Sequence, residues 1–330
     1  MKVDVVIPVK QINSYIQESI RELSKLEYED YRIMVLPDIS NGEYFPNVSI
    51  VPTGEMGPAQ KRDLALRYST ADILAFIDDD AYPRRDWIRN AVRHFDDPEV
   101  AAVGGPAVTP PGDSLLQRVS GAVFLSRFGG GNPERYRPVG KVRKVDDWPS
   151  VNLFVRRDLL GRIGGFNSTY WPGEDTKLCL DIVRMGKKIV YDPEVFIWHH
   201  RREGLMRHLR QVGRYGLHRG FFAKKYPDTS RKLKYFLPTL LVIFLASGIS
   251  IPFLGNPLIA RLWLGGLGVY LATLLVSFYE ILRIEKSLPV ALLSLPYIFL
   301  SHVWYGIRFF QGLVLVRNLA SELRTGKRSQ

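Results

Sequence analysis

Three consecutive aspartates, Asp78, Asp79 and Asp80, directly follow the apolar run 73–77. Like charges this close repel one another, and a bound cation favours their ionised forms. Ligands bind at the carboxyl ends of strands in open α/β sheets. Alternation places Asp78 and Asp80 on the same side of an extended chain. The triplet is therefore compatible with a divalent-metal site, and also with an acidic turn or a helix start.

A second acidic feature, Gly173-Glu174-Asp175, precedes a stretch with apolar residues at helical spacing. A carboxylate at a helix start is often only a cap. Glycines and aromatic residues precede it in 164–171, which is typical of a substrate-facing loop. A carboxylate held beside an acceptor hydroxyl can act as a general base. Both a capping and a catalytic role remain open for this feature.

Two basic features lie further along the chain. The segment 199–202, His-His-Arg-Arg, ends a strand-like run and could hold a metal or phosphates, or form a basic surface beside a membrane. Arg207, Gln211, Arg214 and His218 are three or four residues apart, so they share a face if the segment is helical. That face could contact a diphosphate or lipid headgroups.

Apolar runs alternate with segments of helical spacing through the first 200 residues. The predicted strands are 3–9, 31–36, 48–51, 73–77, 100–103, 151–155, 188–191 and 195–198, and the predicted helices are 12–26, 58–69, 87–95, 156–163 and 175–185. This alternation predicts an α/β fold with a mainly parallel sheet and helices on both faces. Residues 110–150 lack periodicity and are predicted to be a long surface region that shapes a pocket.

Three runs without a charged residue, 235–254, 262–279 and 288–307, predict a membrane domain over 235–318. Each is close to the ~20 residues that cross a bilayer core. The preceding segment 201–234 has 11 Lys or Arg residues against two acidic residues. The positive-inside rule places it on the cytoplasmic side, against anionic lipid. Adjacency to the first run explains the charge without a nucleic-acid partner.

The N-terminus has no secretory pattern, so the large N-terminal part is expected in the cytoplasm. The expected location is the cell (inner) membrane, with several passes. Three spans would place the basic end 324–328 outside, against the positive-inside rule. Two spans with an interfacial or re-entrant segment at 288–316, or four short passes, would keep that end inside.

The order of these pieces resembles the inverting family 2 glycosyltransferases of the GT-A fold, over about residues 3–220. The matching pieces are VVIPVK, AQKRDLALRY, AFIDDDAYP, VNLFVRRDLLGRIGGFN, GEDTKLCLDIVRMGKKIVYDP and IWHHRR. The resemblance implies a cytoplasmic GT-A domain over 1–220, a basic linker over 221–234, the membrane domain, and a basic tail over 319–330. The expected fold is a Rossmann-like α/β domain followed by membrane helices.

The resemblance also assigns roles to residues. Asp78 and Asp80 match the DXD-type motif, which implies Mg²⁺ or Mn²⁺ on the donor diphosphate, with His199 near the same site. Asp175 matches the catalytic base. The implied donor-binding positions are Pro8, Val9, Asp38, Arg62, Asp79, Arg202, Gln211 and Arg214.

The chain departs from the family pattern at three places. Asp38 is followed by Ile39 where a second acid is usual, Asp63 stands where Asn is common, and Tyr215 replaces the Trp of a QxxRW motif. The missing Trp and the short membrane part weaken a processive-synthase interpretation.

The implied reaction moves a sugar from a nucleotide-diphosphate sugar to a hydroxyl of a lipid-linked or glycan acceptor, in cell-surface glycan or polysaccharide synthesis. One alternative is transfer to a polyprenyl phosphate. A sugar nucleotidyltransferase should have a glycine-rich loop after the first strand, and residues 9–13 contain no glycine. A non-catalytic membrane scaffold would not need the three aspartates Asp78, Asp80 and Asp175.

Overall fold

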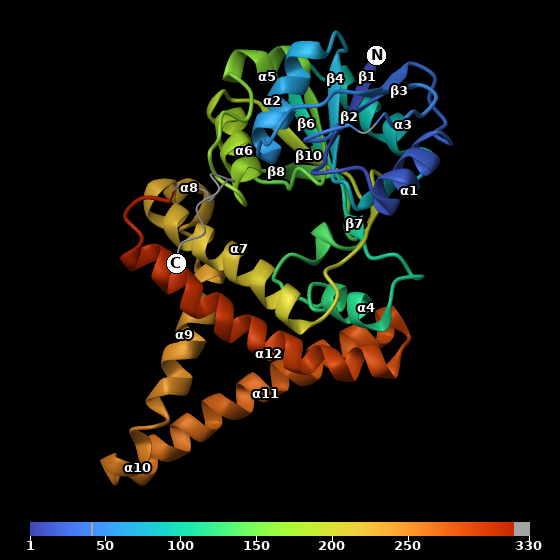
Figure 1. Cartoon of the computed structure of the whole chain (residues 1–330). Helices are drawn as coiled ribbons and strands as arrows, with labels where there is room; N and C mark the ends of the chain where they lie inside the picture. Colours follow the sequence, from blue (N-terminus) through green and yellow to red (C-terminus); the bar gives the residue numbers. More distant parts are fainter. Residues whose placement is uncertain (41, 320–330) are drawn as a thin grey trace. The chain divides into compact units, whose positions relative to one another are not determined.

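The computed structural model describes residues 1–40 and 42–319, which divide into two compact units (Figure 1). The first unit comprises residues 1–108 and 137–200, and the second comprises residues 109–136 and 201–319. The predicted functional boundaries at residues 220, 234 and 318 stay predictions. The predicted basic tail lies outside the described residues, apart from Leu319.

An eight-stranded sheet forms the centre of the first unit, in the order β3-β2-β1-β4-β9-β6-β10-β8. Its strands are β1 (Val3–Pro8), β2 (Tyr31–Leu36), β3 (Val48–Ile50), β4 (Ile73–Ile77), β6 (Val100–Gly104), β8 (Arg143–Val145), β9 (Asn152–Arg156) and β10 (Lys188–Tyr191). The pairings from β3 through β4 are parallel, and β9 is antiparallel to both β4 and β6. The predicted α/β fold is confirmed, with an antiparallel strand inside the sheet.

Helices cover both faces of this sheet (Figure 1). α1 (Ser14–Leu23) and α3 (Trp87–Val92) belong to one core cluster, and α2 (Pro58–Tyr68), α5 (Arg157–Ile163) and α6 (Glu174–Arg184) belong to the other. Because successive strand residues point to opposite faces, Val5 and Ile7 join the first cluster and Val6 joins the second.

A small second sheet brings a distant histidine to the end of β4. Its order is β5-β11-β7, with β5 (Ala81–Pro83), β11 (Ile197–His199) and β7 (Ala107–Val108). β5 follows the aspartate triplet and pairs antiparallel with β11, so that His199 lies opposite Ala81. The sequence did not predict β5, because only three residues separate the triplet from the turn after Pro83.

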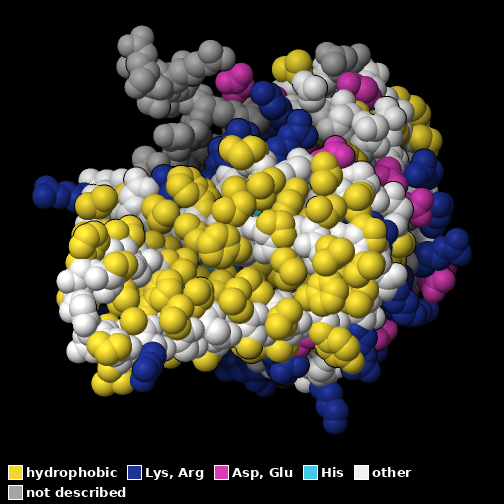
Figure 2. Space-filling view, turned by 90° about the horizontal axis from the view of Figure 1, so that it is seen from below, with side chains coloured by type: hydrophobic (Ala, Val, Ile, Leu, Met, Phe, Trp, Pro, Cys, Tyr) yellow, Lys and Arg dark blue, Asp and Glu magenta, His cyan; other side chains and the backbone are white. Residues whose placement is uncertain are grey.

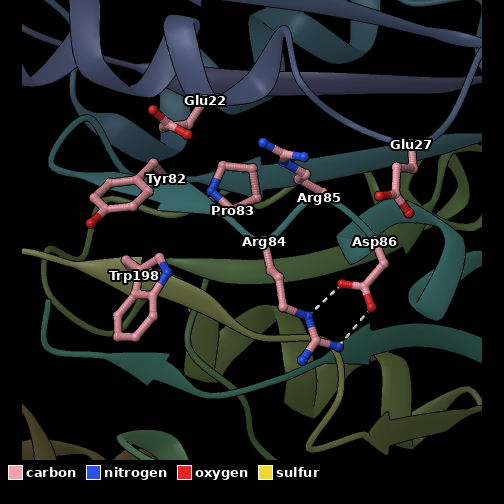
Figure 3. A pocket seen from close by; sticks show the side chains of 8 residues that line it. All are labelled: Glu22, Glu27, Tyr82, Pro83, Arg84, Arg85, Asp86 and Trp198. Atoms are coloured by element: carbon pink, nitrogen blue, oxygen red, sulfur yellow. Dashed lines mark hydrogen bonds and ion pairs between the residues drawn. The ribbon is translucent and has the colours of Figure 1, made fainter.

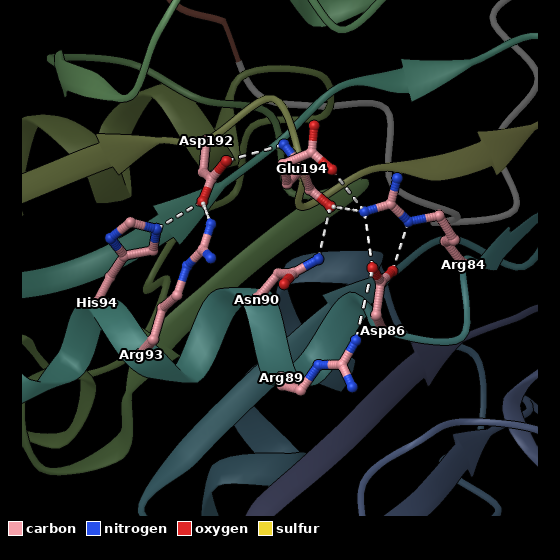
Figure 4. Close-up of polar contacts among 8 residues, drawn as sticks. All are labelled: Arg84, Asp86, Arg89, Asn90, Arg93, His94, Asp192 and Glu194. Carbon is pink, nitrogen blue, oxygen red and sulfur yellow. Dashed lines mark hydrogen bonds and ion pairs between the residues drawn. The ribbon is translucent and has the colours of Figure 1, made fainter.

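An ion-pair network fixes the connection between β10 and β11 (Figure 4). The carboxylate of Asp192, whose side chain is fully buried, lies 2.7 Å from Arg93 Nη2 and 2.6 Å from His94 Nε2, and it accepts the Glu194 N–H. Glu194 in turn pairs with Arg84 at 2.9 Å. Burial alone would raise the pKa of Asp192, but the hydrogen bonds from His94, Arg93 and the backbone lower it to about 2.

The Asp192→Asn variant is expected to lose about 1.5–3 kcal/mol of unfolding free energy, the usual range for a hydrogen bond to a charged group. Because the folded-state pKa is depressed, this contribution is complete above the unfolded pKa of about 3.9 and is lost as the pH falls toward 2. Denaturant titrations at several pH values measure it. The exposed Asp96→Asn on the neighbouring turn is the control. Equal losses in both variants would contradict the prediction.

Helices dominate the second unit. They are α4 (Leu115–Ala122), α7 (Leu205–Lys225), α8 (Pro227–Ser230), α9 (Leu233–Ser247), α10 (Ile251–Leu254), α11 (Pro257–Glu285) and α12 (Leu288–Phe310), which continues as a π-helix over Gln311–Leu315. Two helical segments, Pro257–Glu285 and Leu288–Leu315, are long and apolar enough to cross a membrane. The first predicted run, 235–254, is split into α9 and α10 by a turn at 248–250.

One expectation for this unit is wrong. Residues 110–150 were predicted to lie on the surface, but α4 buries Val119 and Ala122 against residues of α11 and α12. The eight residues of α4 are too few to show helical periodicity. The predicted basic linker, residues 221–234, includes the last turn of α7, α8 and the start of α9.

Candidate functional site

Asp78, Asp80 and His199 form a potential metal-binding group in the first unit. One ligand atom from each lies within 4.8 Å of the others, and His199 Nε2 is 3.0 Å from Asp80 Oδ1. The Asp80 side chain is 10% exposed and that of Asp78 is 35% exposed, so the group opens toward solvent on the side of Asp78. Carboxylates and an imidazole suit Mn²⁺, and carboxylates with water suit Mg²⁺. The two carboxylates and the imidazole are therefore suitable ligands for the predicted Mg²⁺ or Mn²⁺.

Arg62 connects this group to the start of α6. Its Nη2 is 3.0 Å from Asp78 Oδ1, and its Nη1 is 3.0 Å from Glu174 Oε1. The guanidinium is buried and lies over the Phe166 ring, 5.4 Å from the ring centroid. The Arg62 guanidinium therefore pairs with two carboxylates, those of Asp78 and Glu174, that are nearly a hundred residues apart in the chain.

The two acids at the start of α6 have different surroundings. Burial raises the pKa of Glu174 to about 7, and the charge of Asp175 adds to this, against the opposing effect of Arg62. Asp175 is half-buried and accepts N–H groups from Thr176 at 2.7 Å and from Ser150 at 3.4 Å. Glu174 is buried and paired with Arg62, whereas Asp175 is only half-buried. Asp175 is therefore the more accessible carboxylate of the two.

Asp63 explains one of the departures from the family pattern. Its two carboxylate oxygens accept the backbone N–H groups of Phe166 (2.6 Å) and Asn167 (3.1 Å). An asparagine would turn an NH₂ group toward one of these donors. Gly165 has φ +83°, and a Cβ there would overlap the Asp63 carboxylate. Asp63 thus fixes the turn that presents Phe166 to Arg62.

Lys61 ties together the predicted nucleotide-pocket positions. Its Nζ lies 2.6 Å from Asp38 Oδ1 and donates to the carbonyl oxygens of Val9 (2.5 Å) and Leu36 (2.9 Å). These contacts join the ends of β1 and β2, directly after Pro8. The family resemblance implied a donor-binding role for Arg62, and the sequence analysis assigned no role to Lys61. Their burial at successive positions of α2 breaks amphipathic periodicity, so the pattern gave no signal for these contacts.

The donor-binding roles of all the predicted residues, including Pro8, Val9, Asp38 and Arg62, stay predictions. Asp79 is half-buried between the two predicted metal ligands. Arg202, Gln211 and Arg214 belong to the second unit. On α7, Gln211 donates to the Tyr215 hydroxyl at 2.9 Å, which is the i, i+4 contact expected on one helix face.

A shallow cavity of about 410 Å³ lies elsewhere in the first unit (Figure 3). Tyr82 and Trp198, which face each other across the β5–β11 pair, line it together with Arg84. Trp198 precedes His199 on β11, so their side chains point to opposite faces of the small sheet. The cavity is therefore separate from the metal-binding group.

Residues 4–160 match the protein family described as Glycosyl transferase family 2. These residues form a glycosyltransferase domain of that family. A pre-mycofactocin glycosyltransferase of Mycobacterium tuberculosis is 28% identical over 251 residues, which cover 75% of this chain and 53% of that protein. The chain thus spans about half the length of that relative.

Two further comparisons cover most of the chain. A Methanococcus voltae protein, named dolichyl N-acetyl-alpha-D-glucosaminyl phosphate 3-beta-D-2,3-diacetamido-2,3-dideoxy-beta-D-glucuronosyltransferase, is 19% identical over 94% of this chain and 97% of its own length. The mannosyltransferase PcManGT from Pyrobaculum calidifontis, solved with GDP-Man and Mn²⁺, has a TM-score of 0.56 and 22% identity, and the match covers 91% of this chain and 87% of that one. The structural similarity confirms the GT-A-like fold of the chain.

Proposed function

We propose that this protein is a membrane-bound inverting glycosyltransferase. It transfers a sugar from a nucleotide-diphosphate donor to a hydroxyl of a lipid-linked acceptor in cell-surface glycan synthesis. The observation that carries the proposal is the double contact of Arg62 with Asp78 and Glu174, at 3.0 Å each. It places a metal-binding group and an acidic helix start around one buried cation.

The donor diphosphate binds at the metal-binding group in this proposal. Asp78, Asp80 and His199 would hold Mg²⁺ or Mn²⁺, and the ion would supply Lewis-acid stabilisation of the leaving phosphate. The positions around Lys61 hold the nucleotide, by the family resemblance. The Mn²⁺ complex of the Pyrobaculum mannosyltransferase supports the choice of ion.

Asp175 acts as the general base. Its carboxylate takes the proton of the acceptor hydroxyl while that oxygen forms a bond to the anomeric carbon. The bond from the anomeric carbon to the phosphate oxygen breaks, and the nucleotide diphosphate leaves. A single displacement inverts the anomeric configuration. The name of the dolichyl-linked relative, together with the apolar helices, supports a lipid-linked acceptor.

The test is a donor screen of the chain in detergent, with UDP-, GDP- and dTDP-sugars, Mn²⁺ and a polyprenyl-linked acceptor. One donor is expected to release its nucleotide diphosphate. EDTA and the Asp80→Asn variant are each expected to lower turnover on the order of 100-fold or more. Mn²⁺ restores the EDTA-treated protein, and the exposed Asp30→Asn serves as the control. Full turnover in EDTA would refute the metal assignment, and no turnover of any donor would refute the function.

A further inference from the structure

The second unit exposes a large apolar surface. Within the described residues, most exposed large apolar side chains lie between Leu233 and Leu315. Figure 2 shows such side chains gathered on one face, with Lys and Arg side chains at its margin. The most apolar window of α11 has no buried residue, whereas that of α12 is 39% buried. The two long apolar helices therefore differ in how much of their apolar surface is covered by protein: α11 is exposed, and α12 is partly buried.

The buried side of α12 packs along α7. His208 Nε2 lies 2.9 Å from Ser301 Oγ near the start of α7, and Lys224 Nζ donates to the Val316 carbonyl at 2.5 Å near its end. Between them, a Cβ at Gly220 would overlap the Phe309 carbonyl. Contacts advance in the same direction along both helices, so α7 and the second half of α12 run side by side.

The exposed charges of α7 determine how α7 and α12 can be oriented relative to a bilayer. Its exposed basic residues are Arg207, Arg210, Arg214, Lys224 and Lys225, and they are spread over its whole length. Charged side chains in the hydrocarbon core are strongly unfavourable. Since α12 is packed against α7, it cannot cross the core without carrying these charges into it.

The α9–α11 segment is held at one end by α12 and at the other by α4 and the turn after it, and α4 packs against α12. Near the start of α9, the Thr239 hydroxyl donates to the Gly306 carbonyl of α12 at 2.8 Å. Near the end of α11, Glu280 pairs with Arg127 at 2.7 Å and Glu285 pairs with Arg118 at 2.8 Å.

α9 and α11 turn back on each other between these anchors. Trp263 Nε1 donates to the Phe244 carbonyl at 3.0 Å. Residues 233–285 therefore form a hairpin that leaves α12 and returns to the cluster of α4 and α12.

We infer that α7 and α12 lie in the plane of the membrane interface and that only the α9–α11 hairpin enters the hydrocarbon. The partner is a bilayer with anionic headgroups, which the basic side of α7 complements. Ser287 and Arg317, at the two ends of α12, then lie on the same side of the membrane as α7. This inference rests on the membrane attachment included in the proposed function.

Single-cysteine labelling tests this disposition in sealed vesicles of known orientation. The reporters are Met206→Cys on α7, Ser287→Cys, Arg317→Cys, and Ser250→Cys at the hairpin tip. The native Cys179 is buried, so a membrane-impermeant maleimide reaches it only after denaturation. Positions 206, 287 and 317 are expected to label to the same extent from one side. Position 250 is expected to stay unlabelled from that side.

Labelling of Ser287→Cys and Arg317→Cys from opposite sides would overturn the inference and leave the membrane attachment intact. Labelling of Ser250→Cys from the α7 side would show that the hairpin does not insert. Release of the whole protein from vesicles by alkaline carbonate would overturn both this inference and the proposed attachment. Donor turnover in detergent is independent of all three results.

Discussion

Replacing Asp175 by asparagine is expected to lower the rate of sugar transfer by roughly 10²- to 10⁴-fold, the usual contribution of a general base. The amide keeps the shape of the side chain and one acceptor oxygen, so it retains the 2.7 Å hydrogen bond from Thr176 and gives up only the long 3.4 Å contact from Ser150. It cannot take the proton of the acceptor hydroxyl. Donor affinity is expected to stay near that of the unmodified protein, because Arg62 and the metal-binding group are unchanged. Turnover and donor titrations measure the two effects.

The matched control is Asp181→Asn, on the same helix. Asp181 pairs with Lys177 at 2.7 Å in a partly exposed i, i+4 contact, which is worth only ~0.3–0.5 kcal/mol. Near-normal transfer to a hydroxyl acceptor by Asp175→Asn would refute the assignment of the base. Near-normal transfer to a polyprenyl phosphate alone would favour the lipid-phosphate alternative, since a phosphate is largely deprotonated at neutral pH.

Replacing Arg62 by methionine is expected to give the largest loss of stability, about 3–5 kcal/mol, which is typical when one partner of a buried ion pair is removed. Methionine roughly fills the space, but Glu174 is left in a buried site without its cation. Donor turnover should fall as well, because Asp78 and the start of α6 lose their common anchor. Thermal or denaturant unfolding in detergent gives the stability change.

A second variant separates charge from packing. In Arg62→Met with Glu174→Gln, both buried charges are absent, so part of the lost stability should return. Arg67→Met, on the exposed side of α2, is the control and should change the unfolding free energy little. If Arg62→Met proved as stable as Arg67→Met, the bridge would have no structural role.

Much of the fold of the first unit was predictable from local pattern. The strands around Val5, Ile33 and Ala75 lie where apolar runs end in turn residues, and α2 begins at Pro58, a favoured first-turn residue. The short strands β7 and β8 were not predicted from the sequence. β7 has two residues and β8 has three, so their positions depend on pairing with β11 and β10 rather than on their own sequence.

The sequence pointed to Asp78, Asp175 and, by resemblance, Arg62, but not to the contacts that join them. Asp78 and Asp175 stand out because carboxylates follow an apolar run or open a helix. The contact of Arg62 with Glu174 spans 112 residues, and the contact of Asp63 with Phe166 spans 103. No local periodicity encodes such distances. Burial of Lys61 and Arg62 also runs against the preference of basic residues for the surface, so tertiary pairing alone accounts for it.

The bridge at Arg62 makes two binding events thermodynamically linked. Asp78 is shared between the guanidinium and the proposed metal ion, and the same guanidinium restrains the first turn of α6 through Glu174. A ligand that changes the order of that turn therefore changes the affinity for the metal. By reciprocity, metal binding changes the affinity for that ligand by the same factor. With the donor at the metal-binding group and the acceptor beside Asp175, as proposed, Arg62 would couple their binding through a single side chain.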